Sequence, residues 1–135
     1  RSTLGDAALP ADVKVLLGDS MGEMFTYYAA SDLAFVGGSL LPLGGQNLIE
    51  ACAMGKPVLI GPHTFNFSAV SEDAVAAGAA LRVADATALL ATARHLLHAE
   101  DARKAMGAKA LAFAQQHRGA TARTMALLAP LIDRD

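Results

Sequence analysis

Short, mostly apolar runs alternate with segments of helical spacing over the first two thirds of the chain. Four such runs, at residues 13–17, 33–36, 57–60 and 79–83, are predicted as strands because Gly, Pro, Ser or Asp residues bound them. Nearly continuous apolar runs are typical of strands that are buried on both faces of a parallel sheet.

The segments between and after these strands predict helices. We expect helices over residues 22–30, 46–54 and 68–77, and a helical remainder after residue 83. The remainder carries three apolar stripes at helical spacing: Leu89, Leu90, Ala93, Leu96 and Leu97, then Ala102, Met106, Ala110 and Phe113, then Met125, Leu128 and Ile132. We expect the third stripe to be exposed, at least in part, or covered by a second copy of the chain.

Strands that alternate with helices predict the α/β class, here a Rossmann-like parallel sheet with helices on both faces. The length of 135 residues fits one domain. Because only four strands are visible and the first comes almost at once, we expect residues 1–135 to be part of a larger protein.

The composition indicates a packed globular unit, since 53% of the residues are hydrophobic and 18% are charged. No apolar run approaches the roughly 20 residues of a membrane helix, and the first residues lack a secretory signal, so we expect a soluble chain. Cys52 is the only cysteine, which excludes an internal disulfide. It lies in a helical apolar pattern and is expected to be buried in the core.

The net charge of −2 conceals an asymmetry along the sequence. Residues 82–135 carry eight basic and five acidic side chains, whereas residues 1–81 carry three basic and eight acidic ones. A solvated helix face is the simpler interpretation of the basic half, and a surface that attracts anionic lipid is the alternative. We expect no nucleic-acid partner.

Glycine-rich loops follow the first three predicted strands. Ligands of open parallel sheets bind outside the carboxyl ends of the strands, so we expect residues 18–23, 38–47 and 62–66 to surround one concave site. In the second loop, Gly44 and Gly45 lead into a predicted helix start, where free N–H groups and the helix dipole favour a phosphate. Gln46 and Asn47 would supply further donors.

Glu50 follows Asn47 by three residues and should share its helix face. Its carboxylate could accept hydrogen bonds from both hydroxyls of a ribose whose phosphate lies at the helix start. Alternatively, Glu50 only complements the helix dipole.

The other two loops allow two interpretations each. The backbone of residues 18–23 and Met21 could line a nucleobase, or Asp19 or Ser20 could cap the next helix with Glu23 completing a capping box. His63 could contact a sugar or serve as a polar loop residue, and it has no carboxylate at metal-ligand spacing. The other three histidines, His95, His98 and His117, are expected to face solvent.

Several chemistries lack their motifs. The sequence has no P-loop lysine, no nucleophile elbow and no GxGxxG motif followed by an acidic residue on a second strand. Dinucleotide oxidoreduction and triad hydrolysis therefore lose support.

Residues 18–67 resemble the C-terminal domain of 3-deoxy-D-manno-octulosonic acid (Kdo) transferases, because GDSMGE, FVGGSL, GGQNLIE and GPHTFNF occur in the right order. The resemblance implies the donor-binding half of a two-domain GT-B glycosyltransferase that transfers Kdo from CMP-Kdo to a lipid A precursor in lipopolysaccharide biosynthesis. It also implies that the acceptor domain, a membrane-associated segment and an acidic catalytic residue precede this region. The chain alone should then be inactive, with no catalytic residue, no metal and no cofactor beyond the CMP-Kdo substrate.

The resemblance further implies a location at the cytoplasmic face of the inner membrane for the full-length protein. Gln46 departs from the family pattern, since some relatives carry histidine there. The donor-site residues that the motifs and the resemblance select are Gly18, Met21, Gly22, Glu23, Gly38, Ser39, Gly44, Gly45, Gln46, Asn47, Glu50, Pro62, His63 and Asn66.

Two other functions remain open on the sequence alone. The chain could belong to another GT-B glycosyltransferase or an epimerase that uses a UDP-sugar, since that fold shares the ribose-phosphate arrangement. It could also be a non-catalytic α/β interaction module in which the glycine loops are only turns.

Overall fold

The structure is a computed structural model that describes residues 8–132, with all their side chains except those of residues 120–123 and 131–132. Three parallel strands form its sheet in the order β1 (Ala34–Phe35), β2 (Val58–Ile60) and β3 (Ala80–Arg82). In this sheet Phe35 pairs with Leu59, and Leu59 pairs with Leu81. The α/β class and three of the four predicted strands are therefore confirmed.

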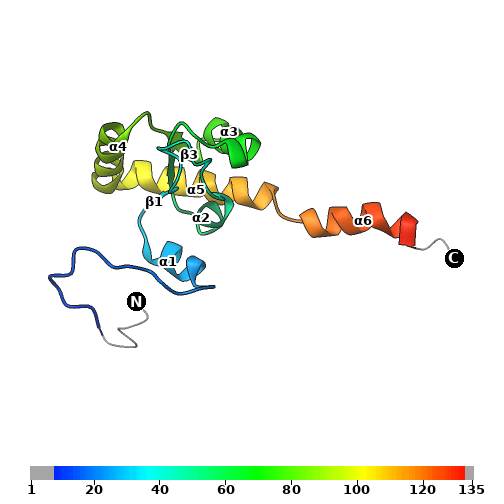
Figure 1. Ribbon diagram of the computed structural model, residues 1–135, viewed down its shortest axis with the longest axis horizontal. Helices are drawn as coiled ribbons and strands as arrows, with labels where there is room; N and C mark the ends of the chain where they lie inside the picture. The colour runs from blue at the N-terminus through cyan, green and yellow to red at the C-terminus, as the bar shows by residue number, and fades with distance from the viewer. Residues whose placement is uncertain (1–7, 133–135) are drawn as a thin grey trace.

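The prediction of a first strand at residues 13–17 is wrong. This segment lies outside the sheet, and in Figure 1 it belongs to the irregular blue trace below α1 (Met24–Ala30). Val15 and Leu17 are 85% and 73% exposed. A β-branched apolar run has strand propensity, but it becomes a strand only where a neighbouring strand takes up its backbone hydrogen bonds.

The remaining helices follow the sheet along the chain. They are α2 (Ile49–Ala53), α3 (Ser68–Ala76) with the short 3₁₀ turn η1 (Phe65–Phe67) before it, α4 (Ala86–His98), α5 (Glu100–Gln116) and α6 (Ala120–Ile132).

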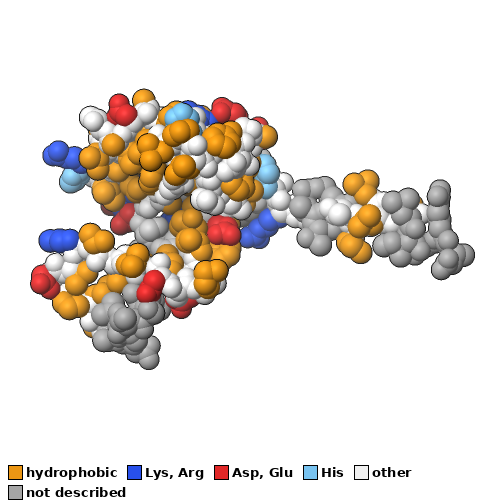
Figure 2. Space-filling view, viewed as in Figure 1, with side chains coloured by type: hydrophobic (Ala, Val, Ile, Leu, Met, Phe, Trp, Pro, Cys, Tyr) orange, Lys and Arg blue, Asp and Glu red, His pale blue; other side chains and the backbone are white. Residues whose placement is uncertain are grey.

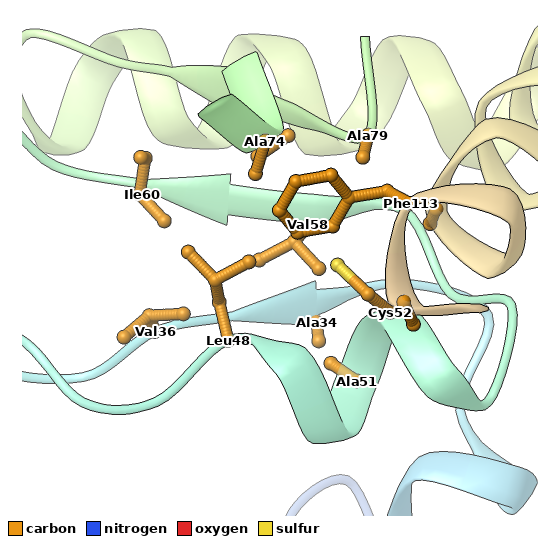
Figure 3. Packing of buried hydrophobic residues seen from close by; sticks show 13 residues of the cluster. Ala34, Val36, Leu48, Ala51, Cys52, Val58, Ile60, Ala74, Ala79 and Phe113 are labelled. Carbon is orange, nitrogen blue, oxygen red and sulfur yellow. The ribbon is translucent and has the colours of Figure 1, made fainter. Parts of the chain in front are cut away.

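Helices cover both faces of the sheet, as the apolar strands predict. On one face, Val58 and Ile60 pack against Leu48, which directly precedes α2, and among residues of α2, α3 and the second half of α5, including Cys52 and Phe113 (Figure 3). On the other face, Leu59 packs against Leu96 of α4 and Met106 of α5. Because successive residues of β2 point to opposite faces, all three are buried.

The first two helical stripes pack as predicted in part. Leu96 is buried with Leu89 and Ala93 against it, but Leu90 and Leu97 are 70% and 50% exposed. In the second stripe, Met106, Ala110 and Phe113 are buried, whereas Ala102 is exposed. In each stripe, therefore, only some of the apolar residues are buried, and the others remain exposed.

The last helix, α6, extends away from the rest of the molecule (Figure 1). Met125 and Leu128 are 53% and 40% exposed, and Leu127 is 76% exposed. Figure 2 shows hydrophobic side chains on this helix standing clear of the main body. The predicted exposure of the third stripe is confirmed for Met125 and Leu128, while the side chain of Ile132 lies outside the described residues.

Cys52 is fully buried beneath α5, as expected for a core residue. Burial raises the pKa of its thiol to about 11 from the ordinary 9.0. Because the thiolate is the reactive form, we expect iodoacetamide at pH 8 to modify the native protein far more slowly than the protein in denaturant.

The raised pKa of Cys52 also predicts a pH dependence of stability. The native state holds the thiol proton more tightly than the unfolded state, so this contribution is complete below about pH 9 and is lost as the pH rises toward 11. The free energy of unfolding, measured across this range for the natural chain and for Cys52→Ala, should fall more steeply in the natural chain. Equal slopes would contradict the assignment.

Candidate functional site

Two loops at the carboxyl ends of β1 and β2 are bonded to each other. The backbone N–H of His63 donates to Ser39 O at 2.9 Å, and that of Asn66 donates to Gly44 O at 3.2 Å. The Asn66 side-chain Nδ2 donates to Leu43 O at 3.3 Å. The structure therefore brings together the second and third loops that the sequence placed at one site.

Ser39 holds this pair of loops from inside. Its side chain is fully buried, and its Oγ donates to Val36 O at 2.5 Å and accepts from Gly61 N at 2.8 Å. Because both functions of the hydroxyl are used within the protein, Ser39 shapes the loop and its hydroxyl does not point to a ligand.

The glycines of the second loop serve its backbone geometry. Gly38, Gly44 and Gly45 have φ angles of +73°, +89° and +72°, a region that strongly favours glycine. Gly45 N donates to Gly38 O at 3.2 Å and closes the loop, and both Gly44 and Gly45 are buried. Asn66 and Phe65 occupy the space that a Cβ on Gly44 would need.

The predicted helix start directly after Gly45 is wrong. Helix α2 begins at Ile49, and the Asn47 side-chain Oδ1 accepts a hydrogen bond from Ile49 N at 2.9 Å. Asn47 thus satisfies one free N–H group at the helix start and keeps residues 46–48 out of the helix. Gln46 and Asn47 are exposed, and Glu50 lies half-buried in the first turn of α2.

Helix α1 lies against α2 and brings Tyr28 close to Glu50. The pKa of the Tyr28 hydroxyl is raised by burial first, then by the nearby Glu50 carboxylate and by Cys52. Residues 18–23 lead directly into α1, which packs against α2, the helix that carries Glu50.

Residues 18–23 form a local cluster before α1. Ser20 Oγ is hydrogen-bonded to the Glu23 carboxylate and, at 2.6 Å, to the Tyr27 hydroxyl. The N-cap residue of α1 is Glu23, whose side chain makes no capping hydrogen bond, so the predicted capping box is wrong. Gly22 has a φ of +78°, and Met21 is 97% exposed.

A pocket of about 460 Å³ opens beside the second loop. It is lined by Phe35, Gly38, Leu40, Leu41, Leu43, Ala84, Asp85 and Ala86. Asp85 is the N-cap of α4, where its carboxylate accepts from Ala88 N at 2.8 Å. Of the three predicted loops only the second lines this pocket, so a single concave site formed by all three stays a prediction.

Arg82, the last residue of β3, is a residue of the site region that was not predicted from the sequence. Its guanidinium donates to Gly61 O and to Thr64 Oγ1 of the third loop and pairs with Glu72 of α3. The available signal was a charged residue at the end of an otherwise apolar strand, but its partners belong to other elements.

The histidines differ in their surroundings. His63 is half-buried in the third loop, and His95 and His98 are exposed as predicted. His117 is only half-exposed: its Nδ1 lies 2.9 Å from Phe113 O and its ring lies 4.3 Å from the Phe113 ring. The prediction that His117 faces solvent is therefore wrong, because one helical turn separates it from an aromatic partner.

Among the residues that the structure describes, no group of three or more His, Cys, Asp and Glu side chains is placed to hold a metal ion. No helix within residues 8–132 is long and apolar enough to span a membrane.

Comparison with known families decides the assignment of the chain. Residues 4–113 match the family described as "Glycosyl transferases group 1". The chain belongs to this family. Its parallel sheet with helices on both faces is the fold expected for such a glycosyltransferase domain.

Individual relatives of this glycosyltransferase chain are similar over most of its length. It is 54% identical over 125 residues to a 3-deoxy-D-manno-octulosonic acid transferase of Bordetella pertussis and 39% identical to one of Haemophilus influenzae, covering 93% and 92% of this chain. The chain spans only 29% of the length of each of these relatives.

A solved structure is also similar. It is the C-terminal CMP-Kdo binding domain of WaaA from Acinetobacter baumannii, 34% identical, with a TM-score of 0.68 over 73% of this chain and 51% of that one.

Proposed function

We propose that this chain is the CMP-Kdo-binding, C-terminal domain of a GT-B glycosyltransferase that transfers Kdo. The observation that carries the proposal is the 54% identity to a Kdo transferase over 93% of the chain. The similarity in fold to a CMP-Kdo binding domain supports it. The acceptor domain would then lie outside residues 1–135.

We assign the donor to the loops at the carboxyl ends of β1 and β2. The backbone N–H groups of the exposed residues Gln46 and Asn47 would face the CMP phosphate, next to the turn that Gly44 and Gly45 form, and Glu50 would accept hydrogen bonds from the ribose hydroxyls. His63 and Asn66 would border the sugar. Gly38 and Ser39 would support the loop beneath the donor, Pro62 would stand at its edge, and Gly18, Met21, Gly22 and Glu23 would lie near the base.

The reaction transfers Kdo from CMP-Kdo to a sugar hydroxyl of a lipid A precursor, and CMP leaves. Preorganised N–H donors stabilise the negative charge that develops on the leaving phosphate, as in an oxyanion hole. We assign the acidic catalytic residue to the acceptor domain and expect no obligatory metal, so this chain alone should bind the donor without transferring Kdo.

The same proposal includes the cellular location of the complete protein. We propose that the complete protein works at the cytoplasmic face of the inner membrane, and that a segment outside residues 1–135 associates with it. The exposed residues Met125 and Leu128 of α6 also make association between isolated copies of the chain an expected behaviour.

Binding measurements test the proposed donor. In calorimetry with the intact protein, CMP should bind at least about 10-fold more tightly than UDP, because polar groups built for one base are left unpaired by another. A melting-temperature assay with CMP, UDP and buffer provides a second readout. Preference for UDP would replace the Kdo assignment by a UDP-sugar enzyme, and no response to either nucleotide in a folded protein would favour an interaction module.

A further inference from the structure

Arg82 connects three elements at the end of the sheet where the loops lie. Its Nη1 donates to Gly61 O at 2.9 Å and to Thr64 Oγ1 at 3.2 Å, and its Nη2 lies 2.5 Å from Glu72 Oε1. Gly61 and Thr64 belong to the loop after β2, whereas Glu72 lies on α3. One side chain of β3 therefore fixes the loop that follows its neighbouring strand.

The two loop acceptors are shielded from water. Gly61 is buried and Thr64 is only 7% exposed, while the Arg82 side chain is itself 27% exposed. Hydrogen bonds in such surroundings are stronger than on the open surface, and a buried acceptor that loses its donor is not fully rehydrated. Removing the Arg82 guanidinium should therefore disturb the loop geometry more than removing one partner of an exposed ion pair would.

The same loop is hydrogen-bonded to the second loop, residues 38–47, which is the glycine loop. Its far end is bonded through Asn66 to Gly44 O and Leu43 O, and its middle is bonded through His63 N to Ser39 O. A shift of Gly61 or Thr64 would therefore move His63 and Asn66, and with them the backbone around Gly44.

We propose that Arg82 is a positioning residue for donor binding, which acts by fixing residues 61–66 against the glycine loop. This inference rests on the proposed function for its substrate, the nucleotide-sugar donor. Arginine suits the role because its planar guanidinium presents several donors in fixed directions, so it can bond the loop and Glu72 at once. A lysine has one flexible ammonium group and cannot reproduce that arrangement.

Steady-state kinetics of the intact enzyme test the proposal. Arg82→Met keeps an apolar side chain of similar reach but removes the donors, and it should raise the KM for CMP-Kdo about 10-fold while kcat changes less than about 3-fold. Arg82→Lys should recover only part of the loss. Lys104→Met is the matched control, because Lys104 forms an exposed ion pair with Glu100 on α5, and it should leave KM unchanged.

Hydrogen exchange provides a readout that does not depend on the substrate. In the intact protein, Arg82→Met should accelerate exchange of the His63 and Asn66 amides, whereas the amides in the middle of α5 should keep their protection. If Arg82→Met does not fold, Thr64→Val decides, since it removes the loop's side-chain acceptor at nearly constant volume and should raise both KM and loop exchange.

The outcomes separate the two proposals. Unchanged KM and unchanged loop exchange in a folded Arg82→Met or Thr64→Val protein would overturn the positioning role. Failure of the natural protein to bind CMP-Kdo would overturn the proposed function, while the exchange of the His63 and Asn66 amides would still show whether Arg82 holds the loop.

Discussion

Replacing Glu50 by Gln in the intact enzyme should weaken CMP-Kdo binding by roughly 10-fold to 150-fold. A hydrogen bond to a charged acceptor contributes about 1.5–3 kcal/mol, and the substitution removes the charge while it preserves the shape of the side chain. Glu50 lies half-buried in the first turn of α2, just after the loop that we assign to the donor phosphate. Calorimetry with CMP-Kdo measures the change in affinity.

A stability measurement separates this role from a contribution to the helix alone. If Glu50 only complements the helix dipole, Glu50→Gln should cost about 0.3–1 kcal/mol of stability and leave donor affinity almost unchanged. Glu100→Gln is the control, because Glu100 is an acidic first-turn residue of α5, away from the loops. Unchanged donor affinity in a folded Glu50→Gln protein would end the ribose assignment.

Replacing Gly61 by Ala should destabilise the domain by about 3 kcal/mol or more and lower its melting temperature by about 10 °C. A Cβ at this position would collide with the backbone of Ser39 and Leu40. Because the atoms it would meet belong to the backbone, no side-chain rotation can relieve the collision. The hydrogen bond from His63 N also holds the Ser39 backbone in place. Thermal unfolding followed by circular dichroism measures the effect.

Gly37→Ala is the matched control for Gly61→Ala. Gly37 lies in the loop after β1, and an added Cβ would meet no atom within 4 Å. Its substitution should change the melting temperature by only a few degrees, in either direction. Equal effects of the two substitutions would mean that the close approach of the loops does not limit stability.

The sheet and the loop positions could be predicted from the sequence because they depend on local patterns. The runs at residues 33–36, 57–60 and 79–83 contain β1, β2 and β3, and the glycine-rich loop after β1 contains Gly38, Gly44 and Gly45, whose φ angles are positive. The run at residues 13–17 has the same local pattern, yet a strand also needs a partner, which no local pattern supplies.

The details of the site depend on contacts between distant segments. The start of α2 at Ile49 was missed because the Asn47 side chain competes for the helix N–H groups. The structural roles of Ser39 and Arg82 come from hydrogen bonds to Gly61, which lies 22 positions after Ser39 and 21 positions before Arg82. Spacing along one helix or strand contains no information about such pairs.

The small size of the sheet has a consequence for the behaviour of these residues expressed on their own. β1 and β3 are both outer strands among the described residues, so each leaves one row of backbone N–H and C=O groups without a neighbouring strand. Val15 and Leu17, in the irregular segment before α1, are exposed as well. Strand addition between molecules would satisfy these edge groups and could bury the exposed Val15 and Leu17 side chains, so a separately produced polypeptide of this length should be prone to aggregation.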